Sequence, residues 1–211
     1  MRKWKLAVLI VAGACVAATA TYVVCSYWRR TGPFASNRAR DAALQVAEKR
    51  QWAQRLQLPS VPNVHKVCDD LYRGGQPTAE GFRELKKLGI RTVVNLRLLH
   101  SDRGEIADTG LEYEHINMEG WEAEDDEAVR FLRIVTDKAR MPVFVHCQFG
   151  SDRTGTMCAV YRVAVQGWSR QEAIDEMTHG GFGFHEELEG FVKYVAGLDV
   201  GAIKRRAGLG Q

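Results

Sequence analysis

The chain has 211 residues, of which 45% are hydrophobic, 26% charged and 9% aromatic, a composition typical of a globular protein and not of a disordered or collagen-like one. Its formal net charge is +3, but residues 1–30 hold five basic and no acidic side chains, so residues 31–211 carry a net charge of −2. A near-neutral domain lacks the concentrated basic face of a nucleic-acid binder, and we expect no nucleic-acid partner.

The N-terminal segment is the first predicted element. No residue from Leu6 to Trp28 is charged, and this run of 23 residues is rich in Ala, Val, Leu and Ile. About 20 apolar residues cross a bilayer core as a helix, and basic and aromatic residues mark the ends of such helices. We therefore predict that residues 1–30 form a membrane anchor, a transmembrane helix, and that the protein is a single-pass membrane protein.

Two alternatives compete with the anchor. Ala18-Thr19-Ala20 has the small residues of a signal cleavage site, and cleavage there gives an exported or periplasmic protein. Residues 12–15 resemble a degenerate lipoprotein site. The apolar run continues past both sites, which favours the anchor. Basic residues flank both ends, so the membrane orientation stays open.

The rest of the chain divides into three parts. Residues 31–62 begin with small, polar and basic residues and continue with a weakly periodic stretch, which predicts a juxtamembrane linker or stalk. Residues 63–198 carry the clear hydrophobic patterns of a folded domain. Residues 199–211 are basic and contain Gly, which predicts a flexible tail.

Helical and strand patterns alternate through the folded domain. The helix over 78–88 ends at a Gly, the β-branched run after it is typical of a strand, and the apolar run at 143–145 is typical of the centre of a sheet covered on both faces. Strands alternating with helices predict an α/β fold with a mostly parallel sheet. In chain order the predicted elements are a helix over 78–88, strands over 90–96 and 111–116, a helix over 124–139, a strand over 143–145 and three further helices.

The cysteines do not form a structural framework. The chain has five, an odd and sparse set for its length, which argues against a disulfide scaffold. No pair has the spacing of a zinc site, and the histidines show no ligand spacing either. We therefore predict no metal and no cofactor, and a single reactive thiol becomes the more interesting possibility.

The stretch HCQFGSDRTG, residues 146–155, lies between the apolar strand and an amphipathic helix. A tight loop that enters a helix directs several backbone N–H groups toward one point, and the helix N-terminus adds about half a positive charge there. Together they form an anion cradle of phosphate size. Gly150 allows a ligand to approach the backbone closely, and the planar fork of Arg153 can hold two phosphate oxygens.

Cys147 begins this loop, where the same dipoles stabilise a thiolate. Such a thiolate can attack a bound phosphorus and form a cysteinyl-phosphate, which water then hydrolyses. We expect the Thr154 hydroxyl to bond the sulfur and His146 to brace the loop. The alternative, a buried structural cysteine, does not explain the Gly, Arg and Thr at these offsets. The predicted phosphate-binding residues are Gln148, Phe149, Gly150, Ser151, Asp152 and Arg153.

The motif H-C-x-x-G-x-x-R-[ST]-G resembles the signature of the cysteine-dependent protein tyrosine and dual-specificity phosphatase superfamily, most closely its compact bacterial dual-specificity-type members. The resemblance implies that Cys147 is the nucleophile and Arg153 the phosphate clamp, in a catalytic domain over 63–198. It also implies a four- or five-stranded sheet flanked by helices, without a metal. The similar segments are LYRGGQP (71–77), GIRTVVNLR (89–97), EHINM (114–118) and MPVFVHCQFGSDRTG (141–155).

The general acid is harder to assign. In the family an Asp on a loop after the strand at 111–116 protonates the leaving oxygen. Here residues 119–127 hold six acidic side chains, and no Asp lies at the usual distance. Asp125, at the junction of loop and helix, is our candidate, and carboxylates in a first helical turn are also favoured by the helix dipole alone. The alternatives are Asp126, Glu122 and Asp152 of the loop.

Other residues lie near the predicted site without a defined role. The resemblance places Arg73 and Gln76 close to it, but Gln76-Pro77-Thr78 is equally typical of a turn into a helix. Asn95 and Arg97 end a strand at the functional edge, where a structural hydrogen bond is as plausible as a substrate contact. The run GGFGFH at 180–185 fits an aromatic wall for a substrate, or ordinary core packing.

These observations favour a membrane-associated phosphatase for phosphotyrosine, and also for phosphoserine and phosphothreonine, in a phosphorylated protein substrate. The first alternative is a phosphoinositide or inositol-phosphate phosphatase, against which the absence of Lys at 148–152 weighs. The second is a non-catalytic pseudophosphatase that binds phosphorylated partners, which typically lacks the Cys or the Arg that this chain has. The oligomeric state is left open.

Overall fold

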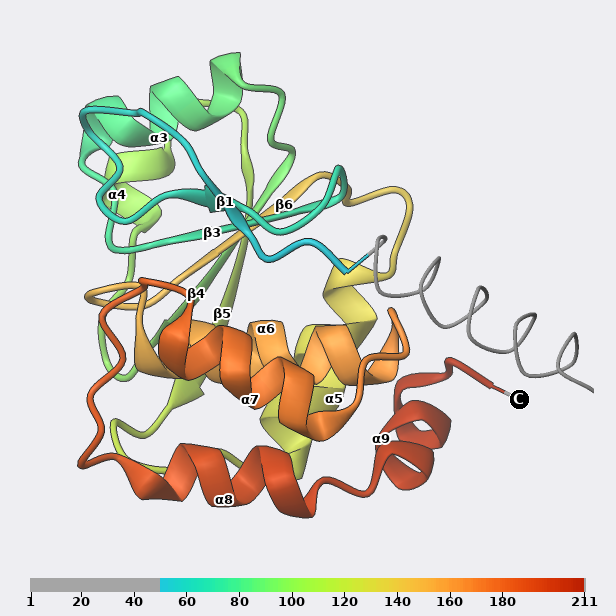
Figure 1. Ribbon diagram of the computed structural model, residues 1–211. Coiled ribbons are helices and arrows are strands. Elements are labelled where there is room, and N and C mark those ends of the chain that lie inside the picture. Colours follow the sequence, from blue (N-terminus) through green and yellow to red (C-terminus); the bar gives the residue numbers. More distant parts are fainter. Residues whose placement is uncertain (1–49, 211) are drawn as a thin grey trace, which may run out of the picture. The chain divides into compact units, whose positions relative to one another are not determined.

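A computed structural model describes residues 50–210 of the chain. From Trp52 onward they form one compact unit. Its strands make one six-stranded sheet in the order β1-β2-β3-β6-β4-β5, with helices on both faces (Figure 1). The strands are β1 (Gln54–Arg55), β2 (His65–Lys66), β3 (Leu71–Gly74), β4 (Thr92–Arg97), β5 (Glu112–Met118) and β6 (Val143–His146). The helices are α3 (Ala79–Lys87), α4 (Arg103–Ile106), α5 (Asp125–Val135), α6 (Asp152–Ala164), α7 (Arg170–His179), α8 (Glu189–Gly197) and α9 (Val200–Ala207).

Strand β6 occupies the centre of the sheet. It pairs in parallel with β3 on one side and β4 on the other, so that Val145 lies level with Arg73 and Val94. Strand β5 extends the parallel part beyond β4. The carboxyl ends of four parallel strands therefore meet at one edge of the sheet, where ligands of open α/β sheets bind.

The alternation of side chains along the strands separates two hydrophobic layers. Val94 and Val145 face the layer formed by α5, α6, α8 and α9. Val93 and Phe144 face the layer formed with α3 and α4. These helix groups lie on opposite sides of the sheet in Figure 1. Burial on both faces explains why β6 is apolar in three consecutive positions.

The sheet is wider than we predicted. It has six strands and not four or five, and its first two strands pair antiparallel, which makes the sheet mixed. Strands β1 and β2 have two residues each, and two residues are too few to show the alternating pattern by which a strand is recognised. The predicted strands over 90–96, 111–116 and 143–145 correspond to β4, β5 and β6, which are parallel as expected. The third neighbour in the parallel part, β3, was not predicted as a strand.

The predicted transmembrane helix and the membrane location must be corrected. Among the residues that the structure describes, no helix is both long and apolar enough to cross a membrane. The longest, α6, has 13 residues and measures about 20 Å at 1.5 Å per residue, well short of a hydrocarbon core of about 30 Å. The segment on which both predictions rested, together with the two alternative processing sites, lies outside the described residues.

The C-terminal segment also differs from the expectation of a flexible tail. Residues 200–207 form α9, in which Ile203 and Ala207 are buried. Asp199 caps the helix through a hydrogen bond from the Ala202 N–H, and Gly208 ends it in a left-handed conformation. Two apolar residues four positions apart, Ile203 and Ala207, are therefore enough to pack this short basic helix against α5.

Candidate active site

The loop that follows β6 surrounds the sulfur of Cys147. This residue is only 2% exposed, and the backbone N–H of Gly150 points at its Sγ over 3.3 Å. Helix α6 begins at Asp152, directly after the loop. The sulfur thus lies at the end of a parallel strand and before a helix N-terminus, where partial positive charge accumulates.

Gly150 is required by both conformation and space. Its φ of +77° lies in the left-handed region, and an added Cβ would come within 2.4 Å of the Gly74 carbonyl carbon and 2.5 Å of the Gly75 nitrogen. The loop therefore rests against the backbone at the end of β3 with no side chain between them.

Arg153 lies between the loop and the end of β5. The residue is half-buried, and its Nη1 donates to the Met118 carbonyl oxygen over 3.5 Å. No ion pair holds Arg153 within residues 50–210. Arg153 is thus close to the loop and to the first residues after β5, as a phosphate clamp requires.

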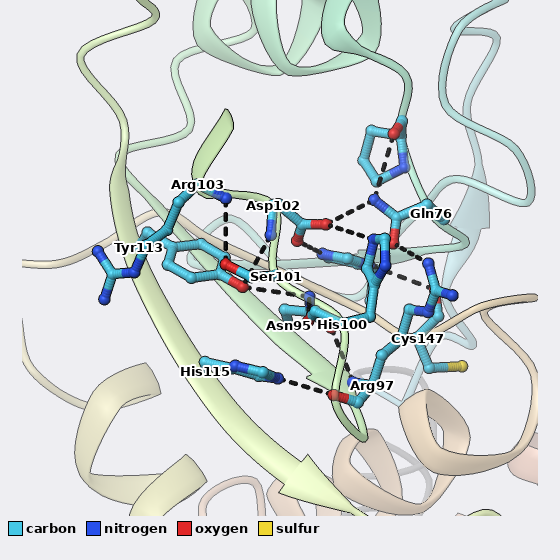
Figure 2. A network of polar contacts seen from close by, with 12 residues as sticks. Gln76, Asn95, Arg97, His100, Ser101, Asp102, Arg103, Tyr113, His115 and Cys147 are labelled. Atoms are coloured by element: carbon cyan, nitrogen blue, oxygen red, sulfur yellow. Dashed lines mark hydrogen bonds and ion pairs between the residues drawn. The ribbon is translucent and has the colours of Figure 1, made fainter. Parts of the chain in front are cut away.

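A buried polar network supports the loop from behind. His146 Nε2 donates to Asp102 Oδ2 over 2.9 Å, and His146 Nδ1 lies 3.3 Å from the Cys147 carbonyl oxygen. Gln76 Nε2 donates to Asp102 Oδ1 and Arg97 Nη1 donates to Gln76 Oε1, over 2.8 and 2.9 Å (Figure 2). Asp102 therefore connects the residue before the nucleophile to two residues of the functional edge.

The charge of Asp102 is stabilised by these contacts. Burial alone would raise its pKa, but the hydrogen bonds from His146 and Gln76 and the neighbouring His100 outweigh it, so the pKa of Asp102 is lowered. Sequence reasoning did not identify this residue. It precedes His146 by 44 residues and belongs to no motif, so only the fold brings the two together.

Two predicted supporting contacts can be compared with the structure. His146 contacts the loop, as described above. The Thr154 hydroxyl is buried and forms no hydrogen bond to the residues that the structure describes, so the expected bond to the sulfur is not present in this state.

The outer side of the loop carries an aromatic residue. Phe149 is 64% exposed, and its ring centroid lies 6.1 Å from that of His185. The Asp152 carboxylate accepts hydrogen bonds from both the backbone N–H and Nδ1 of His185, each over 2.9 Å. The hydrogen bond to Asp152 raises the pKa of His185. The 180–185 segment thus borders the loop, with Phe182 buried and His185 beside Phe149.

The candidate proton donors differ in their contacts. Asp125 accepts a hydrogen bond from the Tyr194 hydroxyl over 3.2 Å and lies 3.6 Å from Arg206 Nη1. Asp126 pairs with the same arginine, and Asp152 is bound to His185. Glu122, in contrast, forms no ion pair or side-chain hydrogen bond with the described part of the chain.

Within residues 50–210, no group of three His, Cys, Asp or Glu side chains is arranged to hold a metal ion. The groups that gather at the loop are a backbone N–H, the Cys147 thiol and the Arg153 side chain, and amides with an arginine suit an anion with several oxygens.

Comparison with known families matches residues 62–189 to the family described as DSP-PTPase phosphatase fused to NAD+ kinase. The dual specificity protein phosphatase TpbA of Pseudomonas aeruginosa strain PAO1 is 34% identical over 154 residues, which cover 72% of this chain and 69% of TpbA. The inositol diphosphatase DSP5 of Arabidopsis thaliana is 28% identical over 125 residues, 54% of this chain and 60% of that protein.

A solved structure shares the fold as well. The crystal structure of P. aeruginosa TpbA in complex with pTyr superposes with a TM-score of 0.67 at 32% identity, over 75% of this chain and 97% of the solved one. Residues 62–189, which match the family, contain strands β2 to β6, the loop after β6 and helices α6 and α7.

Proposed function

Because the chain belongs to the DSP-PTPase family of cysteine-dependent phosphatases, we propose that it hydrolyses phosphotyrosine in proteins through a phosphorylated Cys147. The observation that carries this proposal is the loop itself, in which a buried thiol receives a backbone N–H at 3.3 Å and lies at the entrance to α6. The chain retains both the cysteine and the arginine of the signature, which favours an enzyme over a pseudophosphatase.

The proposed reaction has two steps. The Cys147 thiolate attacks phosphorus, the P–O bond to the substrate breaks, and the leaving oxygen takes a proton from a carboxylic acid. Water then attacks the cysteinyl-phosphate, the S–P bond breaks, and inorganic phosphate leaves with the thiolate restored. In both steps the loop amides and Arg153 hold the three non-bridging oxygens, where they stabilise the charge of the transition state.

Phosphotyrosine is favoured by the shape of the loop. Phe149 presents an exposed ring beside the cradle, which offers apolar surface to an aromatic substrate group. Residues 148–152 contain no Lys to meet additional phosphates. TpbA, whose structure contains pTyr, is also more similar to this chain than the plant inositol diphosphatase is. An inositol diphosphate substrate is the second candidate, supported by that relative.

We propose that the proton donor belongs to the loop between β5 and α5, and that Glu122 or Glu119 supplies it ahead of Asp125. Arg153 contacts the carbonyl of Met118, so the residues directly after β5 lie closest to the phosphate clamp. Neither Glu119 nor Glu122 is held by a cation in the described residues, whereas Asp125 is engaged by Tyr194 and Arg206.

The substrate assignment is tested by steady-state hydrolysis with the full chain under reducing conditions. We expect a phosphotyrosine peptide to have a higher kcat/KM than phosphoserine and phosphothreonine peptides and a diphosphoinositol phosphate. Phe149→Ala should lower kcat/KM for the phosphotyrosine peptide about tenfold, within the range for an aromatic contact, and leave inositol substrates unaffected. Equal activity of Cys147→Ser and wild type would refute the nucleophile, and a preference for the inositol substrate would favour the second candidate.

The proton donor is located by a set of isosteric variants: Glu119→Gln, Glu122→Gln, Asp125→Asn, Asp126→Asn and Asp152→Asn. Loss of the general acid should lower kcat by about 10²–10⁴, most strongly for poor leaving groups such as tyrosine and least for para-nitrophenol. We expect this signature for Glu122→Gln or Glu119→Gln. The same leaving-group dependence in Asp125→Asn alone would return the role to Asp125.

A further inference from the structure

Arg73 is a fully buried arginine at the end of β3. Its exposed fraction is 1%, and its neighbour across the sheet is Val145, two residues before the nucleophile. Nη2 donates to the carbonyl oxygens of Gly150 and Ser151, over 2.7 and 3.3 Å. The phosphatase reaction as described above assigns no task to this side chain.

The charge of Arg73 is not matched by a carboxylate in contact with it. Among the described residues no Asp or Glu forms an ion pair with it, its Nε is buried without a hydrogen bond, and its guanidinium stacks 3.7 Å from the centre of the Phe182 ring. Burial lowers the pKa of Arg73, against the opposing influence of Cys158, Glu176 and Cys147. An arginine remains protonated at neutral pH all the same, and an unpaired buried cation is costly.

The hydrogen bonds of the loop carbonyls show which part of the structure the buried charge of Arg73 stabilises. The Gln148 carbonyl accepts from the Gln76 N–H over 3.1 Å, and the Phe149 carbonyl accepts from Asn63 Nδ2 over 3.1 Å. The Gly150 carbonyl accepts from Arg73 Nη2 over 2.7 Å. The Ser151 carbonyl accepts from the Gly155 N–H of α6 over 2.7 Å and more weakly from Arg73 over 3.3 Å. Four consecutive carbonyls of the loop, from Gln148 to Ser151, thus accept hydrogen bonds from one segment of the chain, residues 63–76.

A carbonyl and the N–H of the next residue lie on opposite sides of the same peptide plane. Holding a carbonyl outward therefore turns the following N–H inward, toward the anion. Arg73 thus holds the peptide plane that carries the Ser151 N–H. The next plane, which carries the Asp152 N–H, is held mainly by the first hydrogen bond of α6, with Arg73 as a second donor.

We propose that Arg73 is a positioning residue for phosphate binding: its buried guanidinium holds the Gly150 carbonyl away from the site, so that the adjoining Ser151 amide faces the phosphoryl group. This inference rests on the proposed role of the 147–153 loop as the phosphate site. Arg73 does not touch the substrate. Its charge adds a fixed positive potential beneath a site that binds a dianion.

Arg162 provides a matched control. It is equally buried, at 2% exposed, and lies on α6, but its guanidinium forms a two-pronged ion pair with Glu176 over 2.6 and 2.7 Å. Its guanidinium also donates to the Val67 carbonyl and to Gln166, both outside the 147–153 loop. Arg162→Lys therefore perturbs a buried arginine without changing the loop.

The experiment measures the inhibition constant of vanadate and the kcat/KM for para-nitrophenyl phosphate in the full chain, below the melting temperature of each variant. For Arg73→Met we expect vanadate to bind at least tenfold more weakly and kcat/KM to fall about 10²-fold, as for loss of a group that supports an oxyanion site. The loss should be the same for good and poor leaving groups. Arg73→Lys, which keeps the charge but not the fork, should lie between this variant and wild type.

The outcomes separate the inference from its premise. A purely structural role would lower the melting temperature and the active fraction of Arg73 variants but leave the vanadate constant of the active fraction unchanged, as expected for Arg162→Lys, and this result would overturn the proposal. Should Arg73→Met fail to fold, the vanadate constant of Arg73→Lys decides in the same way. Failure of the premise has a different signature, namely Cys147→Ser with wild-type activity.

Discussion

Two buried arginines, Arg73 and Arg162, show how the same side chain serves different purposes in one core. Arg162 is neutralised by the carboxylate of Glu176, and its guanidinium also stacks over Trp168 at 4.2 Å. Arg73 is surrounded by carbonyl dipoles and a phenyl ring. An arginine paired with a carboxylate forms a neutral pair with a weak electric field around it. An arginine surrounded only by dipoles keeps its net positive charge and can attract an incoming anion. We infer that the partner of a buried charge, more than its burial, distinguishes support of the fold from support of the site.

The sharpest way to break this comparison is Arg162→Met. It leaves the Glu176 carboxylate buried without a cation, which we expect to lower the free energy of unfolding by about 3–5 kcal/mol. Arg73→Met removes the Arg73 donor from the Gly150 carbonyl, whereas the Ser151 carbonyl keeps the Gly155 N–H, and we expect a cost of about 1–3 kcal/mol. Urea denaturation followed by circular dichroism measures both.

The double variant Arg162→Met/Glu176→Gln controls for packing, because Gln still offers an oxygen to the Ala53 N–H that Glu176 now accepts. We expect the two substitutions together to cost less than the sum of the single ones. If Arg73→Met were as destabilising as Arg162→Met, the distinction between the two arginines would fail.

Asp102→Asn asks whether a carboxylate beneath the loop supports the fold, as Glu176 does, or the site. Asn still accepts from His146 Nε2, but its amide cannot accept from both His146 and Gln76. We expect the free energy of unfolding to fall by about 1.5–3 kcal/mol, the range for hydrogen bonds to a charged group, and kcat to fall about tenfold because His146 contacts the Cys147 carbonyl.

The control is His100→Ala, which removes a partly exposed partner of the same carboxylate at 3.3 Å and should leave kcat near the wild-type value. Thermal unfolding and stopped-time assays distinguish the two effects. Wild-type kcat in Asp102→Asn would assign the network to the fold alone.

The smallest effect on stability is expected at Glu127. Like Arg73, it is a partly or fully buried charged residue without an ion-pair partner in the described residues, and its carboxylate accepts from the Glu124 N–H. Burial raises its pKa from 4.5 to about 6. The folded state therefore holds this proton more tightly than the unfolded state, and the stability contributed by Glu127 declines as the pH rises from about 4.5 to 6.

Glu127→Gln removes this decline. Relative to wild type, the variant should gain stability across that pH interval, by less than about 1 kcal/mol because the group is half exposed and screened. Melting temperatures at pH 4 and pH 7 test the sign. If the melting temperature of the wild type instead rose relative to that of the variant between pH 4 and pH 7, the helix dipole would outweigh the burial of Glu127.

The loop after β6 could be predicted from the sequence because its determinants are local. An apolar strand, a Gly at the left-handed position and a helix start lie within ten consecutive residues, and each leaves a pattern. Asp102 leaves no pattern, and Arg73 was placed near the site only by the family resemblance, without a role. Their effects depend on contacts across 44 and 77 residues. Their positions follow from sheet register, and register is fixed by the packing of the whole core.

The strands β1 and β2 escaped prediction for a related reason. Each owes its two-residue length to pairing with a neighbour and not to its own composition. The acidic segment after β5 shows the opposite difficulty. Six carboxylates satisfy the same chemical requirement, and contacts with Tyr194 and Arg206 distinguish Asp125 and Asp126 from the others.

Adjacent positions of the loop offer unequal freedom for redesign. At Gly150 the backbone of Gly74 and Gly75 blocks any Cβ, whereas Phe149 directs its ring outward and is 64% exposed. A library randomised at position 149 alone can therefore sample new substrate preferences on an unaltered scaffold. Substitution of Gly150 would instead displace the loop backbone and disrupt the phosphate site, whatever its effect on selectivity.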